Sequence, residues 1–192
     1  MKITTIIYIT LLLTILWTGT SSAQEMAVPV DIQVPLFLKI LTFDRNLKER
    51  AGDEIVIAVV YQGKYRSSLN VKDEFVKLLQ EAAVKNIDGI PIRCVPLDIG
   101  ERTDPQNTIA EHNADLLYIT PLRAVNTEAI TAASRAKKKP TLTGVPDYVE
   151  SGLAVGIGIK GDKPQIIINL PAAKAEGADF SSQLLKLAKI LG

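Results

Sequence analysis

Short apolar runs alternate with amphipathic stripes over most of the chain. The run Glu54–Tyr61, EIVIAVVY, is too short for a typical helix and nearly continuous in β-branched and apolar residues, which predicts a strand buried on both faces. Shorter apolar runs predict three further strands, at residues 91–97, 115–119 and 140–143. Helical patterns are expected between them, at residues 70–86, 104–112 and 124–138. This alternation is typical of βαβ units with parallel strands.

One amphipathic helix is expected before these units. Pro35 is acceptable in a first helical turn, and the helix is predicted to run from there to about residue 46. Its buried stripe has helical spacing and consists of Val34, Phe37, Leu38 and Leu41. In the helix that follows the first strand, Asn70 is the expected N-cap.

The pattern changes after Gly144. Residues 153–159 and 165–170 predict two strands joined by the turn KGDKP, which indicates a β-hairpin. A short helical segment is then expected between Pro171 and Gly177. The chain should end in a closing helix with Ser181 as its N-cap and Phe180 packed on Leu185. The buried stripe of that helix is predicted to be Leu184, Leu187, Ala188 and Leu191.

These elements predict an α/β fold. The expected architecture is a single three-layer, Rossmann-like domain at residues 24–192, with a mostly parallel sheet, a C-terminal β-hairpin and a closing helix. Residues 1–23 are expected to be a signal peptide, because Lys2 precedes an apolar run that ends in small residues at Ala23. Cleavage after Ala23 would release an exported domain. An uncleaved N-terminal anchor is the other interpretation of the same segment.

The charge of the domain does not favour a nucleic acid as partner. Removing residues 1–23 takes away one lysine and no acid, which leaves 21 basic and 21 acidic side chains. The basic run Lys137–Lys139 falls where a predicted helix ends, a position that suits cations because of the helix dipole. Cys94 is the only cysteine and is expected to be buried and inert. A bridge between two chains would need an exposed Cys94.

No motif in the sequence supports catalysis, a metal site or a cofactor. The segment Gly156–Gly161 matches the G-x-G-x-x-G dinucleotide pattern, but its glycines fall inside a predicted strand and its turn rather than before a helix. Gly156 and Gly158 are therefore interpreted as positions of a bulge or of close backbone approach. His112 is the only histidine and is expected at the surface, at the end of a short helix.

The sequence favours a binding site at one edge of the sheet. In an open α/β sheet, ligands bind in the crevice beyond the carboxyl ends of the strands. The loops expected there carry donor and aromatic side chains suited to a small anion or a partner surface, namely Tyr61, Arg66, Arg102, Thr120, Arg123 and Tyr148. We predict that Arg66 and Arg123 line a shared cleft. The other interpretation is that these residues are ordinary polar loop ends.

The C-terminal segment carries a distinctive pattern of residues, namely Asn169-Leu170, Ala172-Ala173, Gly177, Phe180-Ser181, Leu184-Leu185 and Leu187-Ala188. With this pattern the segment resembles the YfiR family of bacterial periplasmic proteins. The resemblance extends more weakly over the rest of the mature chain. Four of its signature residues are expected to maintain the fold rather than to contact a ligand, namely Asn169, Gly177, Phe180 and Ser181.

The resemblance implies a regulator without enzymatic activity or cofactor. The namesake of the family binds the periplasmic sensor region of an inner-membrane diguanylate cyclase and holds it inactive, which links cyclic-di-GMP and biofilm formation to envelope conditions. It also uses disulfides in its stability and redox response, and Cys94 alone cannot supply them. The expected partner here is an inner-membrane sensor protein, either a cyclase or a kinase. A periplasmic small-solute binding protein is the alternative, and a homodimer and a small ligand both stay open.

Overall fold

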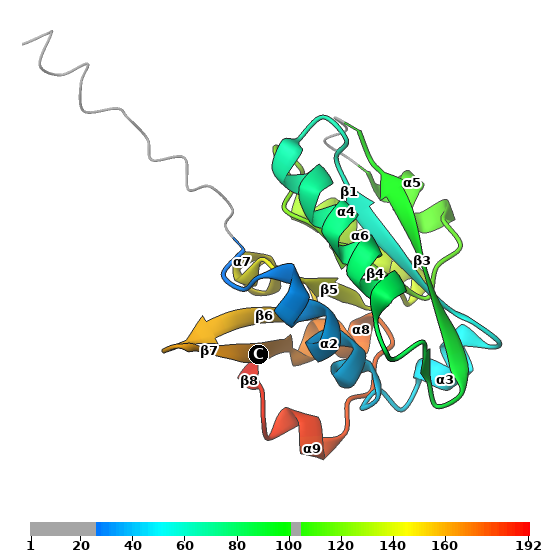
Figure 1. Cartoon of the computed structure of the whole chain (residues 1–192), viewed down its shortest axis with the longest axis vertical. Coiled ribbons are helices and arrows are strands. Elements are labelled where there is room, and N and C mark those ends of the chain that lie inside the picture. Colours follow the sequence, from blue (N-terminus) through cyan, green and yellow to red (C-terminus); the bar gives the residue numbers. More distant parts are fainter. Residues whose placement is uncertain (1–25, 101–104) are drawn as a thin grey trace, which may run out of the picture.

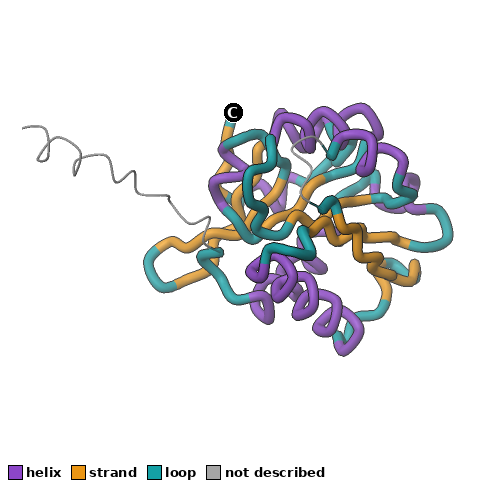
Figure 2. Tube along the Cα trace, turned by 90° about the horizontal axis from the view of Figure 1, so that it is seen from above, coloured by secondary structure: helices purple, strands orange, loops and turns teal. Residues whose placement is uncertain are grey.

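The computed structural model describes residues 26–100 and 105–192. The expected signal peptide and Arg102 lie outside the described residues. Within the described part, eight strands form one sheet in the order β2-β3-β1-β4-β5-β6-β7-β8 (Figure 1). Helices lie on both faces of this sheet (Figure 2). The three-layer α/β fold predicted from the sequence is confirmed.

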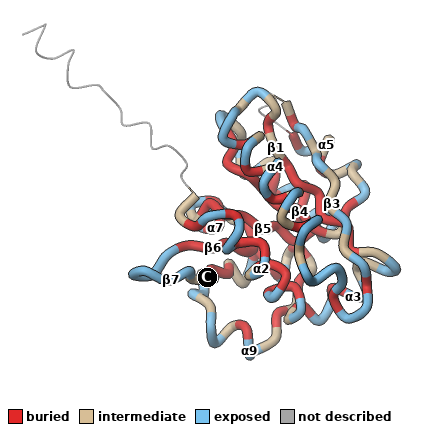
Figure 3. Tube along the Cα trace, in the orientation of Figure 1, coloured by how far each residue is buried: buried red, intermediate tan, exposed pale blue. Residues whose placement is uncertain are grey.

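The centre of the sheet consists of parallel strands, as the βαβ pattern predicts. In spatial order they are β3 (Ile90–Asp98), β1 (Ile55–Tyr61), β4 (Leu116–Ile119), β5 (Thr141–Thr143) and β6 (Val155–Lys160). Residues 55–60 of β1 are all buried, because helices cover both faces of the strand. Buried residues follow the central strands in Figure 3.

Two helical layers enclose separate parts of the core. One face packs on α2 (Val30–Leu41) and α4 (Arg66–Glu81). The opposite face packs on α5 (Gln106–Glu111), α6 (Thr127–Lys137) and α7 (Pro146–Glu150). Alternate residues of β1 supply the two layers, with Ile57 and Val59 in the first and Ala58 and Val60 in the second.

Aromatic stacking joins α2 and α4 to the sheet. Tyr118 of β4 stacks on Phe75 of α4 with ring centroids 3.9 Å apart, and it meets Phe37 of α2 edge-on at 5.7 Å. The Tyr118 hydroxyl is fully buried and donates to Gln33 Oε1 at 3.0 Å. Burial raises the pKa of this hydroxyl far above its usual range, so that it remains a donor. The contacts place α2 firmly against the sheet.

Both helices on this face begin earlier than the sequence predicts. Helix α2 starts at Val30, which places Pro35 inside the helix rather than in its first turn. Proline ordinarily disfavours a helix interior, but burial of Val30 and Val34 stabilises the helical turn before Pro35. Helix α4 starts at Arg66 rather than at the predicted cap Asn70, and it ends at Glu81 rather than near residue 86. Tertiary packing therefore sets these boundaries, and the local cap signal at Asn70 is not used.

The predicted C-terminal hairpin is confirmed. Strand β6 pairs antiparallel with β7 (Lys163–Asn169), and β2 (Asn86–Ile87) pairs antiparallel with β3 at the other side of the sheet. The glycines of β6 sit where the backbone is closely approached, as predicted. A Cβ on Gly156 would lie 2.5 Å from Cγ2 of Val149, and one on Gly158 would lie 2.9 Å from Cδ1 of Ile167.

The closing helix is shorter than predicted. Helix α9 (Ser182–Leu185) follows Ser181, but Leu187 is 68% exposed and the chain ends in a strand, β8 (Lys189–Leu191), parallel to β7. The free edge of β7 offers unpaired backbone groups, and pairing with them replaces further helical turns. Within the described residues the Ser181 side chain makes no capping hydrogen bond. Leu184 is buried, as predicted.

A buried carboxylate ties the segment after α2 to the segment before α9. Asp44 accepts from the backbone N–H of Asp179 at 2.9 Å and pairs with Arg50 of α3 (Leu47–Ala51) at 2.7 Å. A guanidinium N–H of Arg50 also donates to the carbonyl of Gly177. Asp44 and Phe180 form an isolated β-bridge. Residues more than 120 positions apart in the sequence are thereby joined.

Candidate functional site

The loops after β1 and β4 leave neighbouring strands and turn to opposite sides of the sheet. From β1 the chain crosses through α4 to β3, and it then passes back across β1 to reach β4 on the other side. This is the topological switch point at which open α/β sheets bind ligands. A cavity of about 290 Å³ lies between the two loops and is lined by Gln62, Lys64, Tyr65, Arg123 and Ala124.

An amide side chain joins the two loops beneath this cavity. Gln62 is buried, and its Nε2 donates to the carbonyl of Arg123 at 3.1 Å while its Oε1 accepts from the backbone N–H of Arg123 at 2.7 Å. The next residue, Ala124, has a φ of 54°, an unfavourable conformation for a residue with a Cβ. The paired amide therefore holds the loop after β4 in a shape that it would not favour alone.

A chain of hydroxyl groups continues this base into the sheet. The backbone N–H of Gln62 donates to Ser68 Oγ at 2.9 Å, and Ser68 Oγ lies 2.6 Å from Thr120 Oγ1. Thr120 in turn donates to the carbonyl of Val60 at 2.9 Å, so Ser68 is the donor to Thr120. Thr120 is fully buried. The predicted site residue Thr120 is thus hydrogen-bonded within the fold and is not among the residues that line the cavity.

Tyr148 also supports the loop after β4. Its hydroxyl accepts from the backbone N–H of Leu122 at 2.8 Å and donates to the carbonyl of the same residue at 3.3 Å. Burial raises the pKa of this hydroxyl to about 12, so it stays protonated at neutral pH. The structure places Tyr148 behind the loop, where it positions Leu122 and the neighbouring Arg123.

The remaining predicted residues lie at the surface of this edge. Arg123 is exposed and lines the cavity, together with Lys64, which the sequence analysis did not single out. Arg66 is the exposed first residue of α4 and is not among the residues that line the cavity. Tyr61 is half-buried at the end of β1, and Lys72 Nζ lies 5.1 Å from its ring centroid. A cleft shared by Arg66 and Arg123 stays a prediction.

The end of β3 is joined to the loop after β1. Asp98 Oδ1 accepts from the backbone N–H of Gly63 at 3.1 Å and from that of Gly100 at 2.8 Å. A Cβ on Gly63 would lie 2.6 Å from Asp98 Oδ2, so a larger residue at this point would displace the Asp98 carboxylate. At the carboxyl ends of the strands, hydrogen bonds therefore hold the loops together, and exposed cations project from these loops.

Comparison with known protein families matches residues 35–189 to the family described as YfiR/HmsC-like. The chain belongs to the YfiR/HmsC-like family. The comparison with curated proteins finds no match.

Two solved structures share the fold of this YfiR/HmsC-like chain. An ABC domain from Streptococcus pneumonia, solved in complex with L-Trp, has a TM-score of 0.55 and 15% identity, covering 79% of this chain and 62% of that one. A conserved domain protein from Vibrio cholerae O1 biovar El Tor has a TM-score of 0.61 and 17% identity, covering 84% of this chain and 60% of its own. This chain thus spans about three fifths of each structure. At these identities the likeness concerns the fold alone.

The signature residues of this YfiR/HmsC-like chain make contacts within the fold. Asn169 caps α8 (Leu170–Ala175) by accepting from the backbone N–H of Ala172 at 3.1 Å, and its Nδ2 donates to the carbonyl of Val149. Gly177 has a φ of 88°, which suits glycine. Phe180 is buried in the core beside the Asp44 bridge. Asn169, Gly177 and Phe180 thus have roles within the fold, whereas the buried Ser181 Oγ has no hydrogen-bond partner among the described residues.

Lys139 of the YfiR/HmsC-like chain has a different role from the one predicted. Lys137 and Lys138 are exposed at the end of α6, as expected, but Lys139 is buried. Its ammonium donates to the carbonyls of Ile109 and His112 at the end of α5. Burial lowers the pKa of Lys139, while the carbonyl groups favour its charged form. The cation therefore caps a helix other than its own.

The remaining chemically notable residues lie away from the switch point. His112 is half-buried, its Nδ1 has no hydrogen-bond partner in the described part of the chain, and burial lowers its pKa. Cys94 is half-buried, and burial raises the pKa of its thiol, which disfavours the reactive thiolate. Among residues 26–100 and 105–192, no cluster of His, Cys, Asp and Glu is suited to a metal ion. No helix of the same residues is long and apolar enough to cross a membrane.

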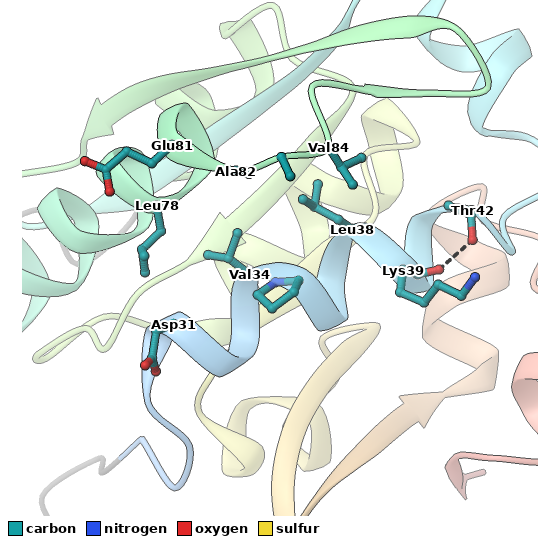
Figure 4. Close-up of a pocket in the computed structure, with 11 residues that line it drawn as sticks. Asp31, Val34, Leu38, Lys39, Thr42, Leu78, Glu81, Ala82 and Val84 are labelled. Atoms are coloured by element: carbon teal, nitrogen blue, oxygen red, sulfur yellow. Dashed lines mark hydrogen bonds between the residues drawn. The ribbon is translucent and has the colours of Figure 1, made fainter.

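A larger hollow lies on the α2 and α4 face, where the sequence analysis placed no site. This groove has a volume of about 540 Å³ and runs between α2 and the C-terminal end of α4 (Figure 4). It is lined by Asp31, Val34, Pro35, Leu38, Lys39, Thr42, Leu78, Glu81, Ala82, Ala83 and Val84. Its apolar residues are spaced as in any amphipathic helix, so no sequence signal distinguishes them from core positions.

Proposed function

We propose that this chain is a non-enzymatic regulator that acts in the periplasm by binding a membrane signalling protein. Membership of the YfiR/HmsC-like family, over residues 35–189, is the observation that carries the proposal. The partner is an inner-membrane diguanylate cyclase or sensor kinase with a periplasmic sensor region. Binding and release would then make cyclic-di-GMP synthesis, and with it biofilm formation, follow conditions in the envelope.

The geometry of the switch point supports binding rather than reaction. The side chains that line the cavity offer an amide, two cations and a phenol ring, with no nucleophile beside a base among them. The polar groups of Gln62, Ser68 and Thr120 form hydrogen bonds within the fold that hold the loops in place. Loops held in this way suit a rigid binding surface. The exposed Arg66 and Arg123 suit an acidic surface on the partner, because a guanidinium binds carboxylates in two-point geometry.

Capture from membranes tests this proposal. The purified chain, carrying a cross-linker, is incubated with solubilised inner membranes of its source, and the captured proteins are identified by mass spectrometry. We expect a protein that joins a periplasmic sensor to a cyclase or kinase domain. The double variant Arg66→Glu, Arg123→Glu should reduce this capture by tenfold or more.

A second double variant serves as the matched control. Lys163→Glu with Lys174→Glu makes the same change of charge on exposed residues away from the switch point, and it should capture the partner as the wild-type chain does. Equal capture by wild type and the arginine variant would refute the role of this edge. Light scattering of the same samples measures whether the chain is a homodimer.

Small-solute binding is the second candidate, and the position of the cavity favours it. The cavity of about 290 Å³ is close to the lower end of ligand-pocket volumes, roughly 300 Å³, and it carries Lys64 and Arg123, which suit a small anion. Succinate and inorganic phosphate are the probes. A ligand at 100 times its Kd should raise the free energy of unfolding by about 2.7 kcal/mol, and Arg123→Glu should abolish that rise. An unchanged melting temperature with both probes would exclude these anions.

A further inference from the structure

The groove between α2 and the C-terminal end of α4 is lined mostly by apolar side chains. Val34 and Leu38 of α2 face Leu78 and Val84 across it (Figure 4), and Pro35 also belongs to the lining. Val84 is 50% exposed, a large exposure for an apolar side chain beside a hollow. The volume of about 540 Å³ falls within the range of small-molecule sites, roughly 300–1,000 Å³.

The dimensions favour one aliphatic chain over a helix. The lining of α2 extends from Asp31 to Thr42, which at a rise of about 1.5 Å per residue is about 16 Å. A hollow of about 540 Å³ over this length is suited to a single hydrocarbon chain, whereas a helix with side chains, about 10 Å in diameter, could place only one face in it.

The walls also disfavour an extended peptide. Where α2 and α4 form the walls, their backbone groups are engaged within each helix and offer no edge for strand pairing, and only residues 82–84 of the lining lie beyond the end of α4. The Thr42 hydroxyl donates to the carbonyl of Lys39 at 2.8 Å and is likewise engaged. A peptide backbone buried here would lose its hydrogen bonds to water without replacement, whereas a hydrocarbon chain would lose none.

The charges at the two ends give the groove a direction. Lys39 stands at one end, where its Nζ lies 5.3 Å from the Phe43 ring centroid, and no carboxylate in the described part of the chain pairs with it. Asp31 stands at the opposite end, and Glu81 lines the α4 side (Figure 4). An anionic group is attracted to the Lys39 end and repelled from the Asp31 end.

We propose that this groove binds a single-chain aliphatic anion, a free fatty acid of about ten to twelve carbons, with its carboxylate on Lys39 and its tail directed toward Asp31. Lys39 and Asp31 are separated by about 12 Å along α2, and an extended hydrocarbon built from bonds of about 1.5 Å advances about 1.25 Å per carbon, which gives about ten carbons. The site is distinct from the switch point and does not depend on the regulator role.

Calorimetric titration of the purified chain with sodium dodecanoate, below its micelle concentration, tests the proposal. We expect one site per chain, with affinity rising about fourfold per added methylene from octanoate to dodecanoate and levelling beyond that length. Dodecyltrimethylammonium, which has the same tail and a cationic head, should bind at least tenfold more weakly. Amide chemical-shift changes should centre on residues 31–42 and 78–84.

Three variants make the test specific. Lys39→Glu should weaken dodecanoate binding by tenfold or more, and Ala83→Trp, at an exposed residue of the lining, should block the groove. Lys77→Glu, on exposed α4 surface outside the lining, is the charge-matched control and should bind as wild type does. Circular dichroism melting verifies that each variant is folded.

Several results would overturn the assignment. Absence of dodecanoate binding to folded wild-type chain would do so, as would equal weakening by Lys39→Glu and Lys77→Glu. Equal affinity for the anionic and cationic amphiphiles would show adsorption without a built site. Self-association that Ala83→Trp abolishes, without dodecanoate binding, would assign the groove to a second copy of the chain.

Discussion

Replacing Glu176 by glutamine should remove a large part of the pH dependence of stability. Glu176 is fully buried at the end of α8, where its carboxylate accepts from the backbone N–H of Thr141 at 2.7 Å and from Ser134 Oγ at 2.8 Å. Burial outweighs these hydrogen bonds and the nearby charge of Arg135, and raises the pKa of the carboxyl from its usual 4.5 to about 7.

The direction of the effect follows from the protons bound in each state. Between pH 4.5 and pH 7 the carboxyl of Glu176 is ionised in the unfolded chain and protonated in the folded one, so the folded state binds more protons. The free energy of unfolding therefore falls as the pH rises through this window. At about 1.4 kcal/mol per pH unit, the total loss is about 3 kcal/mol, and it is complete above pH 7.

Urea unfolding at half-unit steps from pH 4 to pH 8.5 measures this contribution. The stability of wild type minus that of Glu176→Gln should fall by about 3 kcal/mol over the range, because all other titrating groups cancel in the difference. Glu74→Gln, at an exposed glutamate of α4, is the control and should leave the pH profile of wild type unchanged. A difference curve that is flat, or that rises with pH, would refute the reasoning.

Four further substitutions test the packing and hydrogen bonds. Gln62→Ala should cost about 1–3 kcal/mol in urea unfolding, because the backbone N–H and carbonyl of Arg123 lose their partner; a cost below 0.5 kcal/mol would contradict this. Lys139→Met should speed amide hydrogen exchange in α5, whose terminal carbonyls lose their donor, while exchange in α4 is unchanged. Leu184→Ala should lower the free energy of unfolding by about 2–5 kcal/mol, whereas Leu187→Ala, at a residue 68% exposed, should change it by no more than about 0.5 kcal/mol. Equal losses would contradict a chain that leaves the helix before Leu187 and continues as β8.

Most of the central sheet is predictable from the sequence because its strands are covered on both faces. The run Ile55–Val60 contains no polar side chain that would have to face water, so the strand is buried on both faces. The position of Gly156 inside a strand also predicts that another group approaches the backbone closely at this residue. The side chain of Val149 is that group. The loops around the switch point follow from the alternation of elements alone.

The features that the sequence did not reveal depend on contacts between distant segments. Strand β8 exists because the edge of β7 is free, which the stripe from Leu184 to Leu191 does not encode. The role of Gln62 depends on the conformation of the loop that contains Arg123, 61 residues away. The burial of Glu176 against Thr141, 35 residues away, likewise appears only after folding. The groove needs the spacing between α2 and α4, which no local pattern contains.

The bridge between Asp44 and Phe180 has a consequence for how the chain acquires its fold. The backbone N–H of Asp179, 135 residues later, is one of the donors to the Asp44 carboxylate, and β7 gains β8 as its outer neighbour from residues 189–191. Contacts of such long separation form slowly and late. A nascent chain therefore completes this half of the domain only after residues 179–191 have been synthesised.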